Sequence, residues 1–285
     1  MRQPTIRTHR LSVGKIINPN AVPRFFSSFR DQVMVKVTQF KWVPKESAVN
    51  TVFNALQPAI RFTKEECLDL PEMVYAKREV EMTRQQKKYY KELKEKMVIQ
   101  AAGEQITTPN AAVNMNKLLQ ISCGAVYTDN GEALEFDIKH RYKVLREVID
   151  ESSKKILVFV PFRHVIDILV GKLESDGITT EIVRGDVIFK RFQTMPDPKV
   201  LVIQPQAAAH GVTLTAANTV VWWGPTSSLE TYLQANARVH RSGQDHKCTV
   251  VQLQSSDVEK RIYSLLDNRI NIHTEIVDLY KDLLD

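Results

Sequence analysis

Short apolar runs alternate with helical patterns from about Lys155 to the end of the chain. Continuous aliphatic and β-branched runs are typical of buried parallel strands, whereas apolar residues at three- and four-residue spacing predict amphipathic helices. The expected strands are residues 156–160, 180–183, 200–203, 219–223 and 248–254. The expected helices are 164–173, 228–241 and a long one that begins at 257 and breaks near 271. This alternation predicts βαβ units and one parallel sheet, so we expect the α/β class.

The first 150 residues follow a different pattern, with frequent prolines and weak strand signals. The charged run from Thr83 to about Gln100 carries Glu and Lys at helical spacings and predicts a helix. A loop is expected near 103–110 and a further helix near 114–119. We therefore expect three regions: residues 1–60, a mostly helical linker or extension over 61–150, and the α/β domain over 151–285.

Composition narrows the choice of partners and compartment. The chain has 285 residues, 43% of them hydrophobic, so a sizeable core can form. Its net charge of +6 permits a polyanionic partner. Three scattered cysteines with no C-x-x-C pair predict neither a metal site nor a disulfide framework, which favours a reducing cytoplasm. Because no apolar run has transmembrane length and no signal peptide opens the chain, we expect no membrane association.

The most informative run spans residues 234–244. Gln234, Arg238 and Arg241 stand at i, i+4 and i+7, which on a helix places all three on one face. Two guanidiniums and an amide before a Ser-Gly breaker suit a polyphosphate, because arginine stabilises the charge on a transferring γ-phosphoryl group. Two arginines alone more often form a solvated basic face. The full pattern Q-A-x-x-R-x-H-R-x-G-Q resembles motif VI of superfamily 2 helicases, in the form found in Swi/Snf-like DNA translocases.

A second motif, residues 204–214, directly follows the expected strand 200–203. Ligands of parallel sheets gather beyond the carboxyl ends of strands, and small residues let backbone approach phosphate. The run resembles motif V of the same family, which senses nucleotide and nucleic-acid backbone. The family usually has Gly-Gly-x-Gly where this chain has Ala208-Ala209-His210-Gly211. The resemblance implies that Gly211 and Thr213 line the cleft or the DNA track, with His210 a possible side-chain donor to phosphate.

Weaker resemblances surround these two motifs. Residues 155–163 resemble motif IV, which makes Arg163 a candidate DNA contact, although simple solvation of this arginine is an equal alternative. Gly185 occupies a segment where the family contacts a phosphate, but the helix that follows is shorter than usual. Residues 118–127, and the run from Thr83 to Tyr89, resemble the segment joining two helicase lobes. Residues 1–60 then correspond to the tail of a first lobe.

Two chemical elements are missing from the sequence. No G-x-x-x-x-G-K-S/T loop occurs, and no Asp-Glu pair ends an apolar strand. The chain therefore lacks the phosphate-cradling Walker A loop and the Mg²⁺-binding Walker B carboxylates, and we expect no ATP turnover by the chain alone.

The resemblance as a whole implies the C-terminal portion of a Swi/Snf-like superfamily 2 ATPase of phage or prophage type, with a RecA-like second lobe. Such an enzyme uses ATP and Mg²⁺, held mainly by the first lobe, to move on double-stranded DNA. Arg241 would be the arginine finger, Arg238 a second γ-phosphate ligand, and Gln234 their orienting partner; Gly211 would complete the nucleotide site. The first lobe would act in cis or in trans, in a bacterial or phage-infected cytoplasm. A non-catalytic DNA-binding or regulatory module and a purely structural partner remain alternatives.

Overall fold

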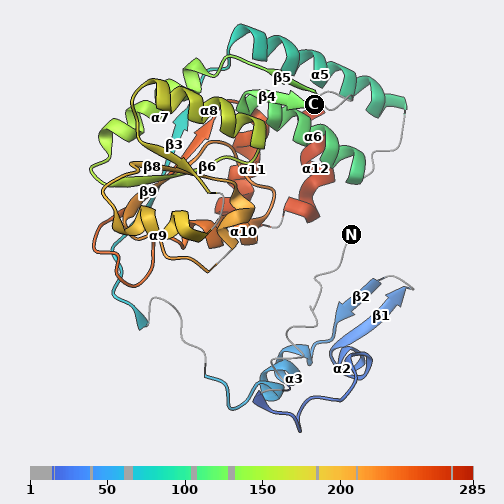
Figure 1. Ribbon diagram of the computed structural model, residues 1–285. Helices are drawn as coiled ribbons and strands as arrows, with labels where there is room; N and C mark the ends of the chain where they lie inside the picture. The colour runs from blue at the N-terminus through green and yellow to red at the C-terminus, as the bar shows by residue number, and fades with distance from the viewer. Residues whose placement is uncertain are drawn as a thin grey trace. The chain divides into compact units, whose positions relative to one another are not determined.

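The structure, a computed structural model, describes residues 15, 17–38, 41–60, 67–103, 108–127, 132–183, 186–209, 211–270 and 272–284. Contacts along the chain divide it into two units, Met1–Leu68 and Asp69–Asp285. The first unit pairs two helices with an antiparallel hairpin around a small apolar core (Figure 1). Its elements are α2 (Phe26–Val33), β1 (Met34–Thr38), β2 (Lys41–Pro44) and α3 (Ala48–Ala55).

The second unit is built on a six-stranded sheet in which every neighbouring pair is parallel. Its spatial order is β3-β10-β9-β6-β8-β7. The strands are β3 (Met73–Glu79), β6 (Lys155–Phe159), β7 (Thr180–Ile182), β8 (Val200–Ile203), β9 (Ala217–Trp222) and β10 (Cys248–Gln254). The predicted α/β class with a parallel sheet is therefore confirmed.

Strand β3 is the main departure from the expected elements, because it lies within the region predicted as a mostly helical linker. Its residues pair in register with β10, from Met73 beside Cys248 to Glu79 beside Gln254. An edge strand keeps one side open to solvent, so its sequence mixes polar and apolar residues and lacks the continuous apolar run of an inner strand. The domain boundaries at 60 and 150 stay predictions.

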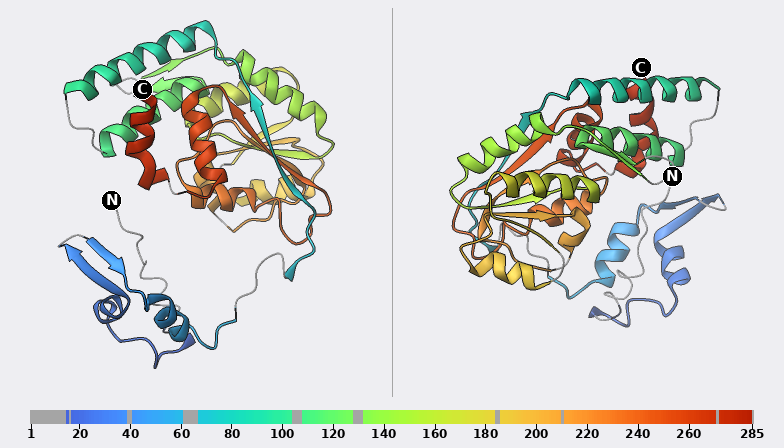
Figure 2. Two further views of the ribbon diagram at one scale, coloured as in Figure 1. Left: turned by 180° about the vertical axis from the view of Figure 1, so that it is seen from behind. Right: turned by 45° about the horizontal axis from the view of Figure 1, so that its top comes forward.

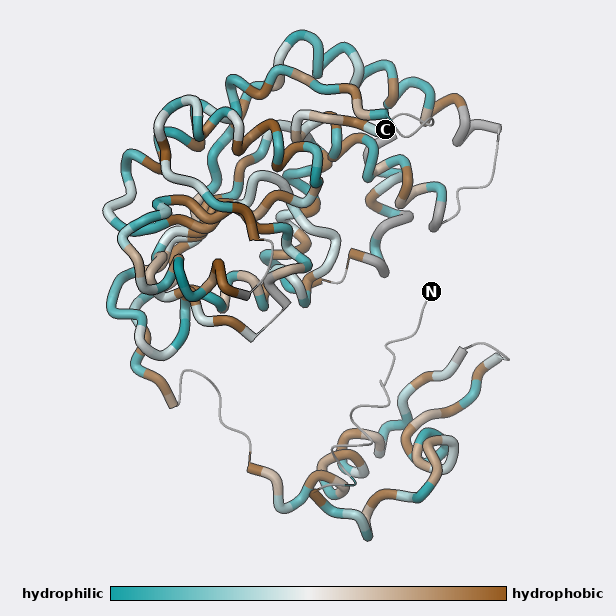
Figure 3. Tube along the Cα trace, viewed as in Figure 1, coloured by the Kyte–Doolittle hydropathy of each residue, from teal (hydrophilic) through white to brown (hydrophobic). Residues whose placement is uncertain are grey.

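Helices cover both faces of the sheet (Figures 1 and 2). One face packs against α7 (Lys139–Glu151) and α8 (Arg163–Ser175), through side chains such as Val158, Leu145 and Leu169. The other face packs against α9 (Asp186–Thr194), α10 (Leu229–Asn236) and α11 (Asp257–Asp267), through Trp222, Phe192 and Ile262 among others. Hydrophobic segments accordingly concentrate in the central strands, with hydrophilic stretches along the outer helices (Figure 3).

Two further helices extend the second layer, and a third closes the chain. They are α5 (Arg84–Gly103), α6 (Thr108–Cys123) and α12 (Ile272–Leu284), and a small hairpin of β4 (Ala125–Tyr127) and β5 (Ala133–Glu135) follows α6. At the start of α5, the Gln86 side chain accepts from the Thr83 backbone and donates to the Ile121 carbonyl at 2.9 Å. The two segments predicted to join the lobes thus contact each other. Among the described helices, none is both long and apolar enough to span a bilayer.

Candidate functional site

Helix α10 begins where the sequence predicts and ends earlier than expected. The Ser228 hydroxyl accepts from the Thr231 N–H, which caps the helix start. The helix stops at Asn236, so the prediction that Arg238 and Arg241 share one helix face with Gln234 is wrong. After Asn236 the chain tightens into a turn, in which the Arg238 N–H donates to the Ala235 carbonyl at 3.1 Å, and the Leu214 N–H donates to the Arg238 carbonyl at 3.0 Å.

The turn that follows α10 brings both arginines beside residues 211–214. Arg241 Nη1 donates to the Val212 carbonyl at 3.2 Å and lies 3.5 Å from the Gly211 carbonyl. Gly211 and Thr213 are both exposed. The runs that resemble motifs V and VI therefore lie against each other, with the Arg241 guanidinium next to the exposed backbone at Gly211.

Two like charges are held close together in this turn. Partial burial and the neighbouring Arg241 guanidinium both lower the pKa of Arg238. An anion placed between the two groups would relieve their repulsion and form charge-assisted hydrogen bonds. The arrangement therefore has the chemistry of an oxyanion or phosphate site.

Two glutamines that the sequence analysis did not single out hold the segment 215–217 in place through hydrogen bonds to its backbone. Gln244 is 3% exposed, and its amide donates to the carbonyls of Ala217 at 2.9 Å, Val239 at 3.0 Å and Thr215 at 3.3 Å. Gln193, from α9, accepts from the Ala216 N–H at 3.0 Å. Gln244 ends the motif VI pattern, but nothing in its local sequence reveals that it is buried.

The remaining predicted site residues are more scattered. Gln234 donates to the Glu230 carboxylate at 3.2 Å, so in this structure that amide serves its own helix; its orienting role stays a prediction. Arg163 Nε lies 3.5 Å from the Gln204 side-chain oxygen, because β6 and β8 are neighbours and both residues follow their carboxyl ends. Gly185 and His210 lie outside the described residues.

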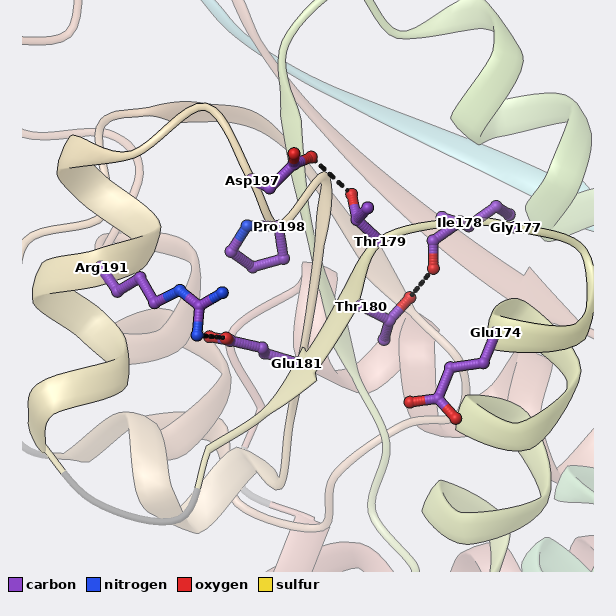
Figure 4. Close-up of a pocket in the computed structure, with 9 residues that line it drawn as sticks. All are labelled: Glu174, Gly177, Ile178, Thr179, Thr180, Glu181, Arg191, Asp197 and Pro198. Carbon is purple, nitrogen blue, oxygen red and sulfur yellow. Dashed lines mark hydrogen bonds and ion pairs between the residues drawn. The ribbon is translucent and has the colours of Figure 1, made fainter.

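A surface pocket of about 510 Å³ lies elsewhere, at the amino ends of β7 and β8 (Figure 4). None of the predicted site residues lines it. Two contacts between its lining residues are present: Glu181 pairs with Arg191 at 2.6 Å, and Asp197 accepts from the Thr179 hydroxyl at 2.8 Å. Within the described ranges, no three His, Cys, Asp or Glu side chains gather to hold a metal ion. The pocket therefore does not replace the arginine turn as the candidate site.

Sequence comparison matches residues 140–243 to the helicase conserved C-terminal domain. The chain is 26% identical over 143 residues to the ATP-dependent helicase FUN30 of Saccharomyces cerevisiae, covering 47% of this chain and 13% of that protein. It is 24% identical over 270 residues to the chromodomain-helicase-DNA-binding protein 1-like of Mus musculus, covering 87% of this chain and 30% of the relative. The chain thus spans a minor part of the length of these relatives.

Solved structures share the fold. The C-terminal part of the Fun30 ATPase domain superposes with a TM-score of 0.59 at 18% identity, covering 76% of this chain and 98% of that one. The SWI2/SNF2 ATPase core of Sulfolobus solfataricus in complex with double-stranded DNA gives 0.58 at 21% identity, covering 83% and 54%. The predicted RecA-like second-lobe fold is thereby confirmed. Residues 140–243 match the helicase conserved C-terminal domain, and the chain resembles the C-terminal portion of SWI2/SNF2-type ATPases.

Proposed function

We propose that this chain is the C-terminal lobe of an ATP-dependent DNA translocase of the SWI2/SNF2 type, and that Arg238 and Arg241 act on the γ-phosphate of ATP. The observation that carries the proposal is the pair of neighbouring guanidiniums beside the exposed backbone at Gly211. The helicase domain match over residues 140–243 and relatives named as ATP-dependent helicases support it.

Arg241 supplies the larger part of the chemistry in this proposal. Its Nη1 donates to the Val212 carbonyl, a partly buried neutral acceptor. A phosphate oxygen is a stronger acceptor than a neutral carbonyl, so the guanidinium gains by exchanging one for the other. Charge that develops on the transferring phosphoryl group strengthens this contact further, which lowers the barrier to hydrolysis. Arg238 adds a second positive charge beside the first.

The lobe depends on a partner for the other half of the site. Mg²⁺ would neutralise the β- and γ-phosphate oxygens, and carboxylates of a first helicase lobe, joined in cis or supplied in trans, would hold it. The described part of this chain provides the arginines and the segment 211–214 that contacts them. We therefore propose that nucleotide is held mainly by the first lobe and that this lobe completes the site.

Double-stranded DNA is the proposed polymer partner. Support comes from the net charge of +6, from relatives named as DNA-binding proteins and from the related ATPase core solved with duplex DNA. Arg163 and Thr213, with His210 and Gly185, are the candidate contacts. Binding through phosphates releases counterions, so affinity must fall steeply as salt rises. Binding at low salt that ignores added salt would argue against this partner.

Two finer assignments stay predictions. The relatives compared above come from a yeast and a mouse, and nothing supports the phage or prophage type. The cytoplasmic compartment also rests on the sequence alone.

Hydrolysis of ATP by a two-lobe mixture tests the proposed function. The chain alone should show no turnover, and adding a first-lobe polypeptide that carries both Walker elements should give hydrolysis that duplex DNA stimulates. Comparable hydrolysis by the pure chain alone would contradict the division of labour. A mixture that forms a complex and binds DNA but never hydrolyses ATP would favour a non-catalytic DNA-binding module.

A further inference from the structure

His240, next to Arg241 in the chain, contacts the segment through which the chain enters the second unit. Its ring Nε2 lies 2.7 Å from the carbonyl oxygen of Pro71. A carbonyl can only accept, so Nε2 is the nitrogen that carries the proton in this contact. Pro71 stands three residues after the end of the first unit at Leu68 and two residues before β3 begins at Met73.

A second anchor follows one residue later. The Glu72 carbonyl accepts from the Cys248 N–H at 2.9 Å, and the Glu72 carboxylate pairs with Lys247 Nζ at 2.8 Å. The ion pair is exposed and contributes little by itself, whereas the backbone bond continues the β3–β10 ladder. Two consecutive residues of the entry segment therefore hold both ends of the loop 240–248.

That loop carries the groups that set the position of Arg241. Gln244 lies within the loop, and its side-chain amide holds the loop by donating to the carbonyls of Ala217 and Thr215. His240 directly precedes Arg241 in the chain, so a shift of the His240 backbone also moves the Arg241 backbone. The ring contact to Pro71 is thus the shortest link from the entry segment to a proposed γ-phosphate ligand.

We propose that His240 is a positioning residue: its hydrogen bond to Pro71 couples the segment that enters from the first unit to the placement of Arg241. This rests on the proposed function in so far as Arg241 acts on ATP. A displacement of residues 69–72 would reach the loop 240–248 through this contact. If the His240 ring served for packing alone, its Nε2–H would not need to point at an acceptor such as the Pro71 carbonyl.

Amide hydrogen exchange in the full 285-residue chain tests the coupling without nucleotide. His240→Phe keeps an aromatic ring and removes the donor, whereas His240→Gln keeps an N–H at the reach of Nε2. Exchange is followed at Leu214 and Gln244, whose N–H groups bond to the Arg238 and Arg241 carbonyls. We expect about tenfold faster exchange at both amides in His240→Phe and near wild-type exchange in His240→Gln.

The control is His246→Phe, a change at an exposed histidine in the same loop, which should leave both amides unchanged. Equal exchange in wild type and His240→Phe, or equal increases in the Phe and Gln variants, would overturn the proposal. The same variants are then assayed for ATP hydrolysis with a first-lobe polypeptide, where His240→Phe should lower kcat about tenfold at unchanged KM. If wild type itself never hydrolyses ATP, the proposed function fails while the exchange result still decides the coupling.

Discussion

The guanidinium of Arg141 donates to both carboxylate oxygens of Glu259, at 2.8 and 2.9 Å, inside the second unit. Their side chains are only 4% and 0% exposed. Burial alone would lower the pKa of Arg141, but the adjacent carboxylate keeps it above its ordinary value. Arg141 also donates to the Trp223 carbonyl, and Glu259 accepts from the Ser256 N–H at 3.1 Å. The pair therefore ties α7 to the end of β9 and to the start of α11.

Removing one partner of this pair should be strongly destabilising. Arg141→Met leaves a carboxylate buried without its counter-charge, and we expect a loss of about 3–5 kcal/mol in the free energy of unfolding. The matched control is Arg78→Met, which breaks the exposed 2.8 Å pair with Glu151. That change should cost less than about 1 kcal/mol. Urea denaturation measures both, and equal losses would contradict the importance of burial.

Gly224 should be intolerant of a side chain for a steric reason. An added Cβ would lie 2.4 Å from the Cys123 sulfur, well inside contact distance. We expect Gly224→Ala to lower the unfolding free energy by about 1–3 kcal/mol, and Cys123→Ala in the same chain to restore part of the loss, because neighbouring changes are non-additive. No rescue by the second change would mean that the clash is not the cause.

Gly171 supplies the opposite control for this experiment. It lies within α8, and apart from the backbone of its own helix and its chain neighbours, no atom of the described residues comes within 4 Å of an added Cβ. Since glycine costs a helix backbone entropy, Gly171→Ala should raise the unfolding free energy by about 0.5–1 kcal/mol. The two glycine variants should therefore shift the urea midpoint in opposite directions.

The inner sheet is predictable from sequence because its signal is local. Runs such as 200–203 are fully buried on both faces, so they are continuously apolar and cannot be confused with a surface element. β3 is hard to predict because an edge strand is half solvated. The end of α10 is harder still to predict, because the turn after the helix pairs with a distant segment: the Leu214 N–H donates to the Arg238 carbonyl.

The candidate site divides in the same way. The pattern at residues 234–244 singles out Arg238 and Arg241 as candidates, and the structure places the Arg241 guanidinium beside Gly211. The burial of Gln244 and the contact of His240 with Pro71 have no local signal, because a polar residue's partner is set by tertiary packing. Arg141 also looks like a solvated residue of an amphipathic helix until Glu259 is seen beside it.

Thiol reactivity should separate the three cysteines. Cys67 is exposed, whereas Cys123 and Cys248 are buried. Burial raises the pKa of the Cys123 thiol, and the Glu259 carboxylate adds to that rise although Arg141 opposes it. Because the thiolate is the reactive form, a disulfide reagent at about pH 8 should label one thiol rapidly in the native chain.

The three thiols should all react after unfolding. Cys67→Ser is the control, and it should remove the rapid phase from the native protein. If the native Cys67→Ser protein still showed rapid labelling, the reacting thiol would be Cys123 or Cys248, and that cysteine would not be protected by burial.

The arginine turn yields the prediction closest to function. In a mixture with a first-lobe polypeptide, Arg241→Ala should lower kcat about 10³-fold, as loss of an arginine finger does. Arg238→Ala should be comparably damaging. Among the described residues, Arg241 donates to the neutral backbone carbonyls of Gly211 and Val212, so its loss should change the unfolding free energy by less than about 1 kcal/mol.

Arg191→Ala is the matched control for these variants. Arg191 is an exposed arginine of the second unit, and it pairs with Glu181 at the pocket of Figure 4. Removing its charge lowers the net charge by the same amount, so it should weaken general attraction to DNA equally and leave kcat at saturating DNA unchanged. A fall in kcat shared by all three variants would point to lost positive charge rather than to phosphate contact. Intact turnover in Arg241→Ala, with a large loss of stability, would make the arginine a structural residue that fastens residues 211–212 to the turn.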